Sequence, residues 1–331
     1  MKILITGSAG FIGFHLTKLL LSQGYEVLGV DNYNNYYDPQ LKRQRTKILQ
    51  QSNQKFNQIE ADINDAEKIN SFCTEVPDFV VHLAAQAGVR YSLQDPQAYL
   101  NANINGTFCI MELARKWKVK HLLMASTSSV YGSNTEMPFD EKQKCDNQIS
   151  FYAATKKSCE ILAHSHAHSY NLPTTMFRFF TVYGPWGRPD MALFKFTHNI
   201  LAGKPIDIYN NGLMTRDFTY VDDLVKSIFL LLDKQPDINP LGDFDSLSPV
   251  APFRIVNIGN SQPEPLMGYI SILERELGQE AIKNYLPMQP GDVQATSSDT
   301  KLLKALTGYK PDTKIKHGIH EFVKWYKQYH S

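Results

Sequence analysis

Tyr152 and Lys156 stand four residues apart in YAATK, and together they could exchange a proton with a substrate. If the segment is helical, this spacing puts both side chains on one face, one turn apart. A phenol with a pKa of about 10 is a poor base at neutral pH, but a neighbouring ammonium favours its ionised form. The pair predicts a tyrosine base supported by a lysine. The alternative is an i,i+4 pair on an exposed helix surface that has no role in catalysis.

Hydroxyl side chains follow an apolar segment upstream of this pair. Ser126, Thr127, Ser128 and Ser129 come directly after HLLMA (121–125). If that segment is a strand of a parallel sheet, the hydroxyls lie at its carboxyl edge, where such sheets bind ligands. One of them could share the proton of a reacting alcohol. Local capping of the turn is the alternative explanation.

A glycine-rich loop opens the chain. TGSAGFIG supplies Gly7, Gly10 and Gly13 directly after a β-rich segment and before a helical pattern. Without side chains the backbone can turn sharply and approach a pyrophosphate, whose charge then lies against N–H groups at the start of a helix. The loop predicts a dinucleotide site, although a turn without a ligand would need similar residues.

Asp31 ends the second β-rich segment, where its carboxylate could accept hydrogen bonds from the adenosine ribose of the same dinucleotide. Because it would also repel a 2′-phosphate, it favours NAD over NADP. Three basic residues downstream could soften this preference: Lys42, Arg43 and Arg45. Asp62 is a candidate for the adenine edge, with the N-cap of the next helix as the alternative role.

These residues need elements that bring them together, and the first part of the chain alternates β-rich segments with helical patterns. The candidate strands are 2–6, 26–30, 56–60, 78–82, 121–125 and 174–178. They predict an α/β fold with a doubly wound parallel (Rossmann) sheet over residues 1–180. Residues 181–331 should form a smaller substrate-binding lobe, while segments near 217–235 and 254–260 could pack with the first domain.

Composition narrows the function classes. The 331 residues include 34 basic and 33 acidic side chains, without a basic stripe that would suggest a nucleic-acid partner. The four cysteines, Cys73, Cys109, Cys145 and Cys159, form no CxxC pair, so we expect neither disulfides nor a metal site. Because no long apolar stretch or signal peptide is recognisable, we expect a cytoplasmic protein without a membrane span.

The chain resembles the extended short-chain dehydrogenase/reductase family (NAD-dependent epimerases and dehydratases) over essentially its whole length. Among its members, UDP-glucuronate 4-epimerases are the most similar. The resemblance is carried by TGSAGFIG (6–13), VDNYNNYYDP (30–39), HLAAQAGVRYS (82–92), SSVYG (128–132), YAATKK (152–157), RFFTVYGPWGRPDMA (178–192), GKPIDIYNNGLMTRDFTYVDD (203–223) and MQPGDVQAT (288–296).

This resemblance implies roles for individual residues. Tyr152 would be the proton-exchanging base, Lys156 would bind the nicotinamide ribose and lower the pKa of the tyrosine, and Thr127 would hydrogen-bond the reacting hydroxyl. The implied contacts to NAD come from Gly7, Gly10, Phe11, Ile12, Gly13, Asp31, Asn32, Asp62, Ile63, Leu83, Ala84, Ala85, Asn103, Tyr152 and Lys156.

The implied contacts to a UDP-sugar come from Arg90, Ser128, Ser129, Thr181, Arg188, Arg216 and Asp292. Each arginine is a reasonable ligand for phosphate or carboxylate oxygens, with a structural ion pair as the alternative for Arg90 and Arg188. The chain departs from the family pattern at Phe14, where a small residue is usual, and at Gln289, where hexose epimerases often place an arginine on the diphosphate.

The expected reaction is NAD-dependent inversion at C4 of a UDP-sugar, most simply UDP-glucuronate to UDP-galacturonate through a 4-keto intermediate. Related dehydratases carry Asp-Glu at positions 128–129, and related decarboxylases carry a glutamate at 129. Serines stand at both positions here. UDP-glucose or a UDP-N-acetyl-uronate are alternative substrates, and an NAD-sensing protein without turnover is an alternative of another class. By resemblance, the helices around 99–117 and 150–170 would pair in a homodimer.

Overall fold

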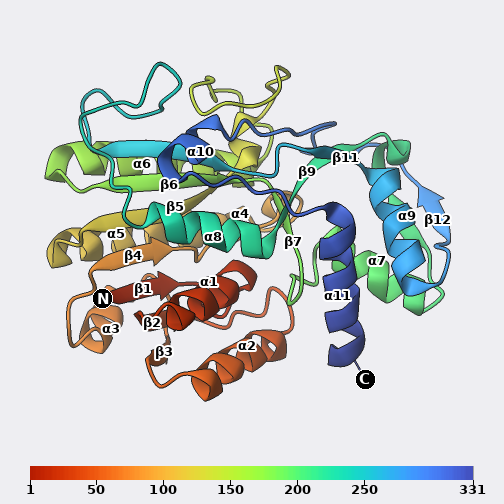
Figure 1. The fold of residues 1–331 in the computed structure, drawn as a ribbon, viewed down its shortest axis with the longest axis horizontal. Coiled ribbons are helices and arrows are strands. Elements are labelled where there is room, and N and C mark those ends of the chain that lie inside the picture. The colour runs from red at the N-terminus through yellow and green to blue at the C-terminus, as the bar shows by residue number, and fades with distance from the viewer. Residues whose placement is uncertain (331) are drawn as a thin grey trace.

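Seven parallel strands form the centre of the larger part of the molecule (Figure 1). The structure is a computed structural model and describes residues 1–330. The strands are β1 (Lys2–Thr6), β2 (Glu26–Asp31), β3 (Phe56–Glu60), β4 (Phe79–His82), β5 (His121–Thr127), β6 (Thr174–Phe179) and β10 (Phe253–Ile258). Their order is β10-β6-β5-β4-β1-β2-β3, so the direction of winding reverses between β1 and β4. In such sheets the ligand lies beyond the carboxyl ends at this reversal.

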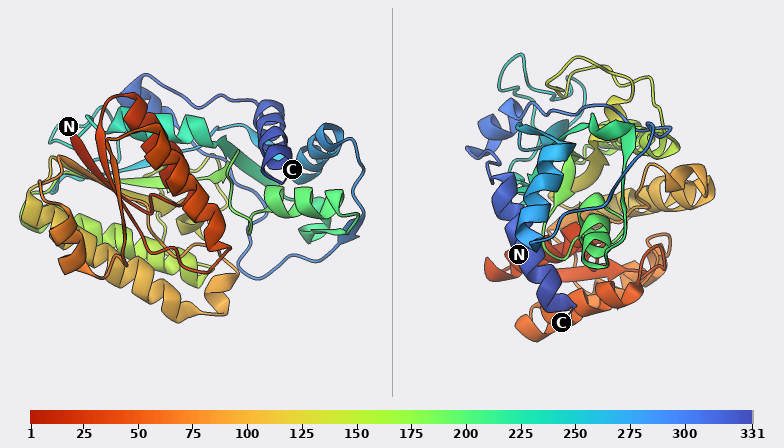
Figure 2. Two further views of the ribbon diagram at one scale, coloured as in Figure 1. Left: turned by 90° about the horizontal axis from the view of Figure 1, so that it is seen from below. Right: turned by 90° about the vertical axis from the view of Figure 1, so that its right-hand side faces the viewer.

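Helices cover both faces of the sheet (Figure 2). On one side lie α1 (Phe11–Ser22), α2 (Pro39–Ser52), α8 (Val221–Leu231) and α10 (Lys301–Thr307); on the other lie α3 (Ala66–Phe72), α5 (Gly106–Trp117) and α6 (Phe151–Tyr170). Each layer buries a separate apolar cluster against the sheet. The strand sequences consist mostly of apolar residues because helices cover both faces of the sheet.

The six predicted strands are present, and the doubly wound α/β fold is confirmed. The seventh strand, β10, pairs in parallel with β6 although about 75 residues separate them. Helix α8 packs against α1, so this later segment also covers the sheet.

Apart from the short helix α4 (Pro96–Tyr99), which contacts α6, the remaining helices and strands gather at one end of the sheet (Figure 1). They are the strands β7 (Thr181–Tyr183), β8 (Ile206–Ile208), β9 (Thr215–Tyr220), β11 (Pro263–Pro265) and β12 (Lys283–Tyr285), with the helices α7 (Ala192–Leu201), α9 (Leu266–Leu277) and α11 (Ile315–Tyr329). Their core is rich in aromatic rings, and Phe218 stacks on Tyr269 with ring centroids 4.4 Å apart. This aromatic lobe faces the carboxyl ends of the central strands.

Within residues 1–330, no helix combines the length and apolar character needed to cross a membrane, and no group of three or more His, Cys, Asp or Glu side chains is arranged to hold a metal ion. All four cysteines are free thiols.

Candidate active site

The glycine loop (residues 7–13) connects β1 to α1, and its glycines are required by close backbone approach. Gly7 has a φ of +72°, and a Cβ built on Gly13 would lie 2.1 Å from the Gly7 carbonyl oxygen. A Cβ on Gly7 would lie 2.8 Å from the backbone nitrogen of Ala84. Helix α1 begins after Gly10 with no side-chain cap from residues 1–330 and no acidic residue in its first turn. This helix start, with Phe11 and Ile12, is therefore suited to a phosphate anion.

Asp31 lies at the carboxyl end of β2 and is buried. Its carboxylate accepts hydrogen bonds from the backbone N–H groups of Ala9 (3.2 Å) and Tyr33 (2.9 Å). Burial raises the pKa of Asp31, while the nearby Lys42 ammonium opposes this shift. The side chain thus fixes the glycine loop against β2 and keeps further lone pairs for a ribose.

Asp62 follows β3 and lies beside Asn32, which donates a hydrogen bond of 2.9 Å to its Oδ2. The alternative role of Asp62 as a helix N-cap is wrong, because Asp65 caps α3 by accepting from the Lys68 N–H at 3.0 Å. Asp62 instead accepts from the Asn64 N–H at 2.9 Å in a local turn. Its neighbour Ile63 is buried against α5, where a Cβ on Gly106 would lie 2.3 Å from its Cδ1.

The basic residues of α2 have partners within the protein. The Lys42 Nζ donates to the Asn34 side chain at 2.6 Å, and Arg43 pairs with Glu60 at 3.1 Å on the surface. Arg45 is buried and binds backbone oxygens. With these cations engaged and Asp31 at the end of β2, the site is better suited to a ribose hydroxyl than to a 2′-phosphate.

Tyr152 and Lys156 lie on the first turns of α6, whose start is capped by Ser150 through the Ala153 N–H at 3.1 Å. Burial raises the pKa of Tyr152, and a hydrogen bond with Thr127 and the charge of Arg188 partly offset this rise. Lys156 is buried, which lowers its pKa. Its ammonium makes no hydrogen bond or ion pair within the described chain. It is therefore available to a ligand.

The cation that acts on Tyr152 in this structure is thus Arg188, which the sequence placed only on the substrate. An effect of Lys156 on the pKa of the phenol stays a prediction.

Thr127 ends β5 beside this pair. Its Oγ1 accepts from the Ser129 N–H at 3.2 Å and lies 3.3 Å from the Ser129 hydroxyl, so it caps the short turn that contains Ser128. The local capping that was considered from the sequence is present, together with the contact to Tyr152. Ser126 points elsewhere, because it donates to the buried Glu160 at 2.7 Å.

Leu83, Ala84 and Ala85 follow β4 directly. The Leu83 and Ala84 N–H groups bond to the carbonyl oxygen (3.1 Å) and the hydroxyl (3.2 Å) of Thr6, which holds this segment against the glycine loop.

Asn103 is fully buried in a short π-helical segment before α5. Its carboxamide accepts from the Gln86 N–H at 2.9 Å and donates to the Thr155 hydroxyl at 3.0 Å and to the Gln86 carbonyl at 3.1 Å. The side chain therefore ties the segment after β4 to α6, next to Lys156.

The predicted substrate residues fall into two groups. Arg90, Arg216 and Asp292 come together at the edge of the aromatic lobe, where Arg90 pairs with Asp292 at 2.8 Å. Burial lowers the pKa of Arg216, while Asp292 raises it. The Arg216 guanidinium donates to the Val293 carbonyl at 2.6 Å.

Arg188 and Thr181 form the second group, nearer to Tyr152. Arg188 pairs with Asp190, with Nε and Oδ1 3.0 Å apart, and Tyr36 donates to the same carboxylate at 3.2 Å. The ion pairs considered as alternatives for Arg90 and Arg188 are thus present. Asp190 and Tyr36 were missed, although GRPDM places Asp190 two residues after the arginine.

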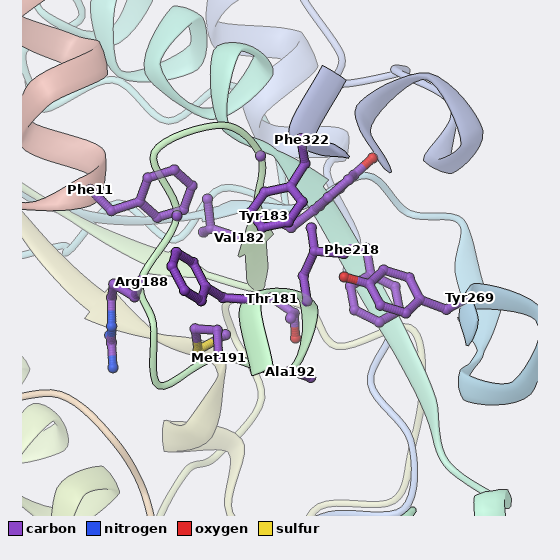
Figure 3. Close-up of a pocket in the computed structure, with 14 residues that line it drawn as sticks. Phe11, Thr181, Val182, Tyr183, Arg188, Met191, Ala192, Phe218, Tyr269 and Phe322 are labelled. Carbon is purple, nitrogen blue, oxygen red and sulfur yellow. The ribbon is translucent and has the colours of Figure 1, made fainter. Parts of the chain in front are cut away.

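A pocket joins the first turn of α1 to the aromatic lobe (Figure 3). Thr181 and Arg188 are among its lining residues, and Phe11 of α1 lines it next to the glycine loop. The other lining residues are Val182, Tyr183, Gly184, Gly187, Met191, Ala192, Leu193, Phe194, Phe218, Tyr269 and Phe322. The lining thus includes two of the predicted substrate residues, but not Tyr152, Thr127 or Lys156.

Residues 3–245 match the model of the NAD dependent epimerase/dehydratase family. The chain belongs to this family. A probable UDP-glucuronate 4-epimerase from Rhizobium meliloti is 51% identical over 99% of the chain and 97% of the relative.

Two solved structures of epimerases are similar to this family member over nearly its whole length. UDP-glucuronic acid 4-epimerase from Bacillus cereus, in complex with UDP-glucuronic acid and NAD, has a TM-score of 0.88 and 34% identity over 99% of this chain and 100% of that one. UDP-glucose 4-epimerase from Thermotoga maritima, with UDP-glucose, has a TM-score of 0.86 and 28% identity over 100% of both chains.

Proposed function

We propose that this chain is an NAD-dependent UDP-sugar 4-epimerase that interconverts UDP-glucuronate and UDP-galacturonate. Two observations together carry the proposal: Tyr152 lies beside Thr127 with Lys156 one turn further along α6, and the chain is similar over its whole length to UDP-glucuronate 4-epimerases. The glycine loop, Asp31 and the unpartnered Lys156 ammonium fit the phosphates and riboses of NAD.

The protein's own groups would handle the proton. A bound NAD would supply the hydride chemistry at C4 of the sugar that inversion requires. Tyr152 takes the proton of the C4 hydroxyl and later gives it back, and Thr127 hydrogen-bonds the same oxygen. Lys156 would hold the nicotinamide ribose. Arg188 favours the ionised form of the phenol by its charge.

The carboxylate of the sugar must be held so that the 4-keto intermediate does not lose CO2. A 4-ketouronate is a β-keto acid and loses CO2 when its carboxylate aligns with the carbonyl π system. We assign Thr127, Ser128, Ser129 and Thr181 to hold the carboxylate in another plane by neutral hydrogen bonds. The sequence supplies no carboxylate at positions 128–131 that could act as the second acid or base of an elimination.

Arg90, Arg216 and Asp292 would bind the UDP part at the edge of the aromatic lobe. UDP-glucose is the second candidate substrate, because the Thermotoga maritima enzyme has nearly the same fold similarity. The higher identity to the UDP-glucuronate enzymes favours the uronate.

Incubation of the purified protein with UDP-glucuronate tests the assignment. We expect UDP-galacturonate by anion-exchange chromatography and proton NMR, without CO2 and without net NADH. Unchanged UDP-glucuronate with folded, NAD-loaded protein would contradict the proposal. Turnover of UDP-glucose or an N-acetylated uronate under the same conditions would mean that the proposed substrate is wrong and that the proposed reaction, 4-epimerisation, is right.

We also propose a cytoplasmic homodimer that pairs through α5 and α6. Large apolar side chains on these helices are exposed, among them Phe108, Ile161 and Leu162. Burial of such a patch in a partner would remove it from water. Sedimentation should give twice the 37.7 kDa mass of the chain, and a single-chain mass at micromolar concentration would contradict the dimer.

A further inference from the structure

Arg45 is a fully buried arginine of α2 that forms no ion pair with a carboxylate in residues 1–330. One terminal nitrogen donates to the Ala9 carbonyl and the Tyr37 hydroxyl, each at 3.0 Å. The other donates to the Trp186 carbonyl at 2.6 Å and to the Gly187 carbonyl at 3.4 Å. The Asp31 carboxylate interacts with this charge from beyond hydrogen-bond distance, but all the hydrogen-bond acceptors of Arg45 are neutral oxygens. Because burying a charge on neutral acceptors is costly, the position of Arg45 calls for an explanation beyond packing.

The carbonyls that Arg45 binds belong to two different parts of the site. Ala9 lies in the glycine loop, where the pyrophosphate of the cofactor is proposed to bind. Trp186 and Gly187 lie in residues 184–191, which we name the substrate loop because it carries Arg188 and lines the pocket. One guanidinium therefore spans the proposed cofactor site and the proposed sugar site.

The substrate loop is held in a backbone conformation that it would not readily keep alone. Trp186 has a φ of +59°, which is unusual for a residue with a side chain. His15 of α1 contacts the Pro185 carbonyl at 2.9 Å, and Phe14 packs on the Trp186 ring with centroids 5.5 Å apart. Phe14, the departure from the family pattern, is thus part of the same contact.

We propose that Arg45 is a positioning residue that couples the glycine loop to the substrate loop and so places Arg188 for the UDP-sugar. The planar fork of a guanidinium can bind carbonyls on both loops at once, which the point charge of a lysine cannot do. The coupling rests on the proposed function. By linkage, occupation of either site stabilises the arrangement that favours the other.

Binding without turnover tests this coupling. All proteins carry Tyr152→Phe and are prepared with NAD, and UDP-glucuronate is titrated by calorimetry. We expect Arg45→Met to weaken the Kd for UDP-glucuronate about tenfold. Arg45→Lys should weaken it by nearly as much, because the charge is kept and the fork is lost. Retained NAD per chain should fall in both variants.

Arg43→Met is the matched control, because Arg43 lies on the same helix but is exposed and pairs with Glu60 at 3.1 Å. It should bind UDP-glucuronate as the parent does. Hydrogen exchange of the peptide that covers 184–191 should quicken in Arg45→Met and Arg45→Lys, without a change in α5. A purely structural role would lower the melting temperature and leave the Kd unchanged.

Two results would overturn the coupling: folded Arg45→Met with the parent's affinity, or full recovery of affinity by lysine, which would show that charge alone matters. If Arg45→Met does not fold, Arg45→Lys and His15→Ala decide, since each loses only part of the contact with the substrate loop. Failure of the parent itself to bind UDP-glucuronate would instead contradict the proposed function.

Discussion

Tyr152→Phe should lower kcat for 4-epimerisation by about 10²- to 10⁴-fold, the usual contribution of a positioned acid–base group. The variant keeps the ring, which packs edge-on against Tyr99 with centroids 6.0 Å apart, and loses only the hydroxyl that bonds Thr127. Binding of NAD and UDP-glucuronate should therefore stay near wild type. Initial rates by NMR, together with calorimetric titrations, measure both quantities.

The pH profile gives this prediction a second readout. Burial raises the pKa of Tyr152 in the protein without ligands. Because only the phenolate can take a proton, kcat should rise with pH until Tyr152 is ionised in the complex with NAD and substrate. The residual activity of Tyr152→Phe should lack this limb. Tyr170→Phe is the control, because Tyr170 is exposed at the other end of α6 and its variant should keep the wild-type rate. A kcat near wild type for Tyr152→Phe would assign the base elsewhere.

The sequence predicted most of the sheet because strands buried on both faces are apolar runs, a local signal. β10 was harder to place, since nothing local indicates that Phe253–Ile258 pairs with a strand about 75 residues earlier. Its position depends on the packing of the whole domain, including α8 on α1.

In the proposed site, too, local features could be predicted from the sequence and long-range contacts could not. The spacing of Tyr152 and Lys156 and of the three loop glycines is written in short segments, so their chemistry could be inferred. Contacts between distant segments could not. Arg45 was considered only for its charge near a ribose phosphate, whereas the structure directs it toward the carbonyls of Ala9 and Trp186.

Arg178→Met should have the largest effect on stability. Arg178 of β6 and Glu160 of α6 are both buried and form two hydrogen bonds of 2.9 Å. Removing the guanidinium leaves a buried carboxylate whose remaining cation, Lys157, reaches it from the surface at 3.1 Å. We expect a loss of about 3–5 kcal/mol in the free energy of unfolding, measured by urea denaturation at pH 7.

The pH dependence and a double variant separate this ion pair from simple loss of packing. Burial alone would raise the pKa of Glu160, but Arg178 brings it below its ordinary value of 4.5. The ion pair therefore stabilises the fold fully above pH 4.5. This contribution is lost as the pH falls through the lower pKa of the folded state. In Arg178→Met the carboxyl should instead have a raised pKa, and the variant should gain stability on acidification. The difference between the two proteins must therefore shrink from pH 7 toward pH 4.

Adding Glu160→Leu to Arg178→Met removes the unpaired charge and should recover most of the loss at pH 7. A loss that is the same at both pH values, and that the double variant does not recover, would mean that packing rather than charge joins α6 to the sheet.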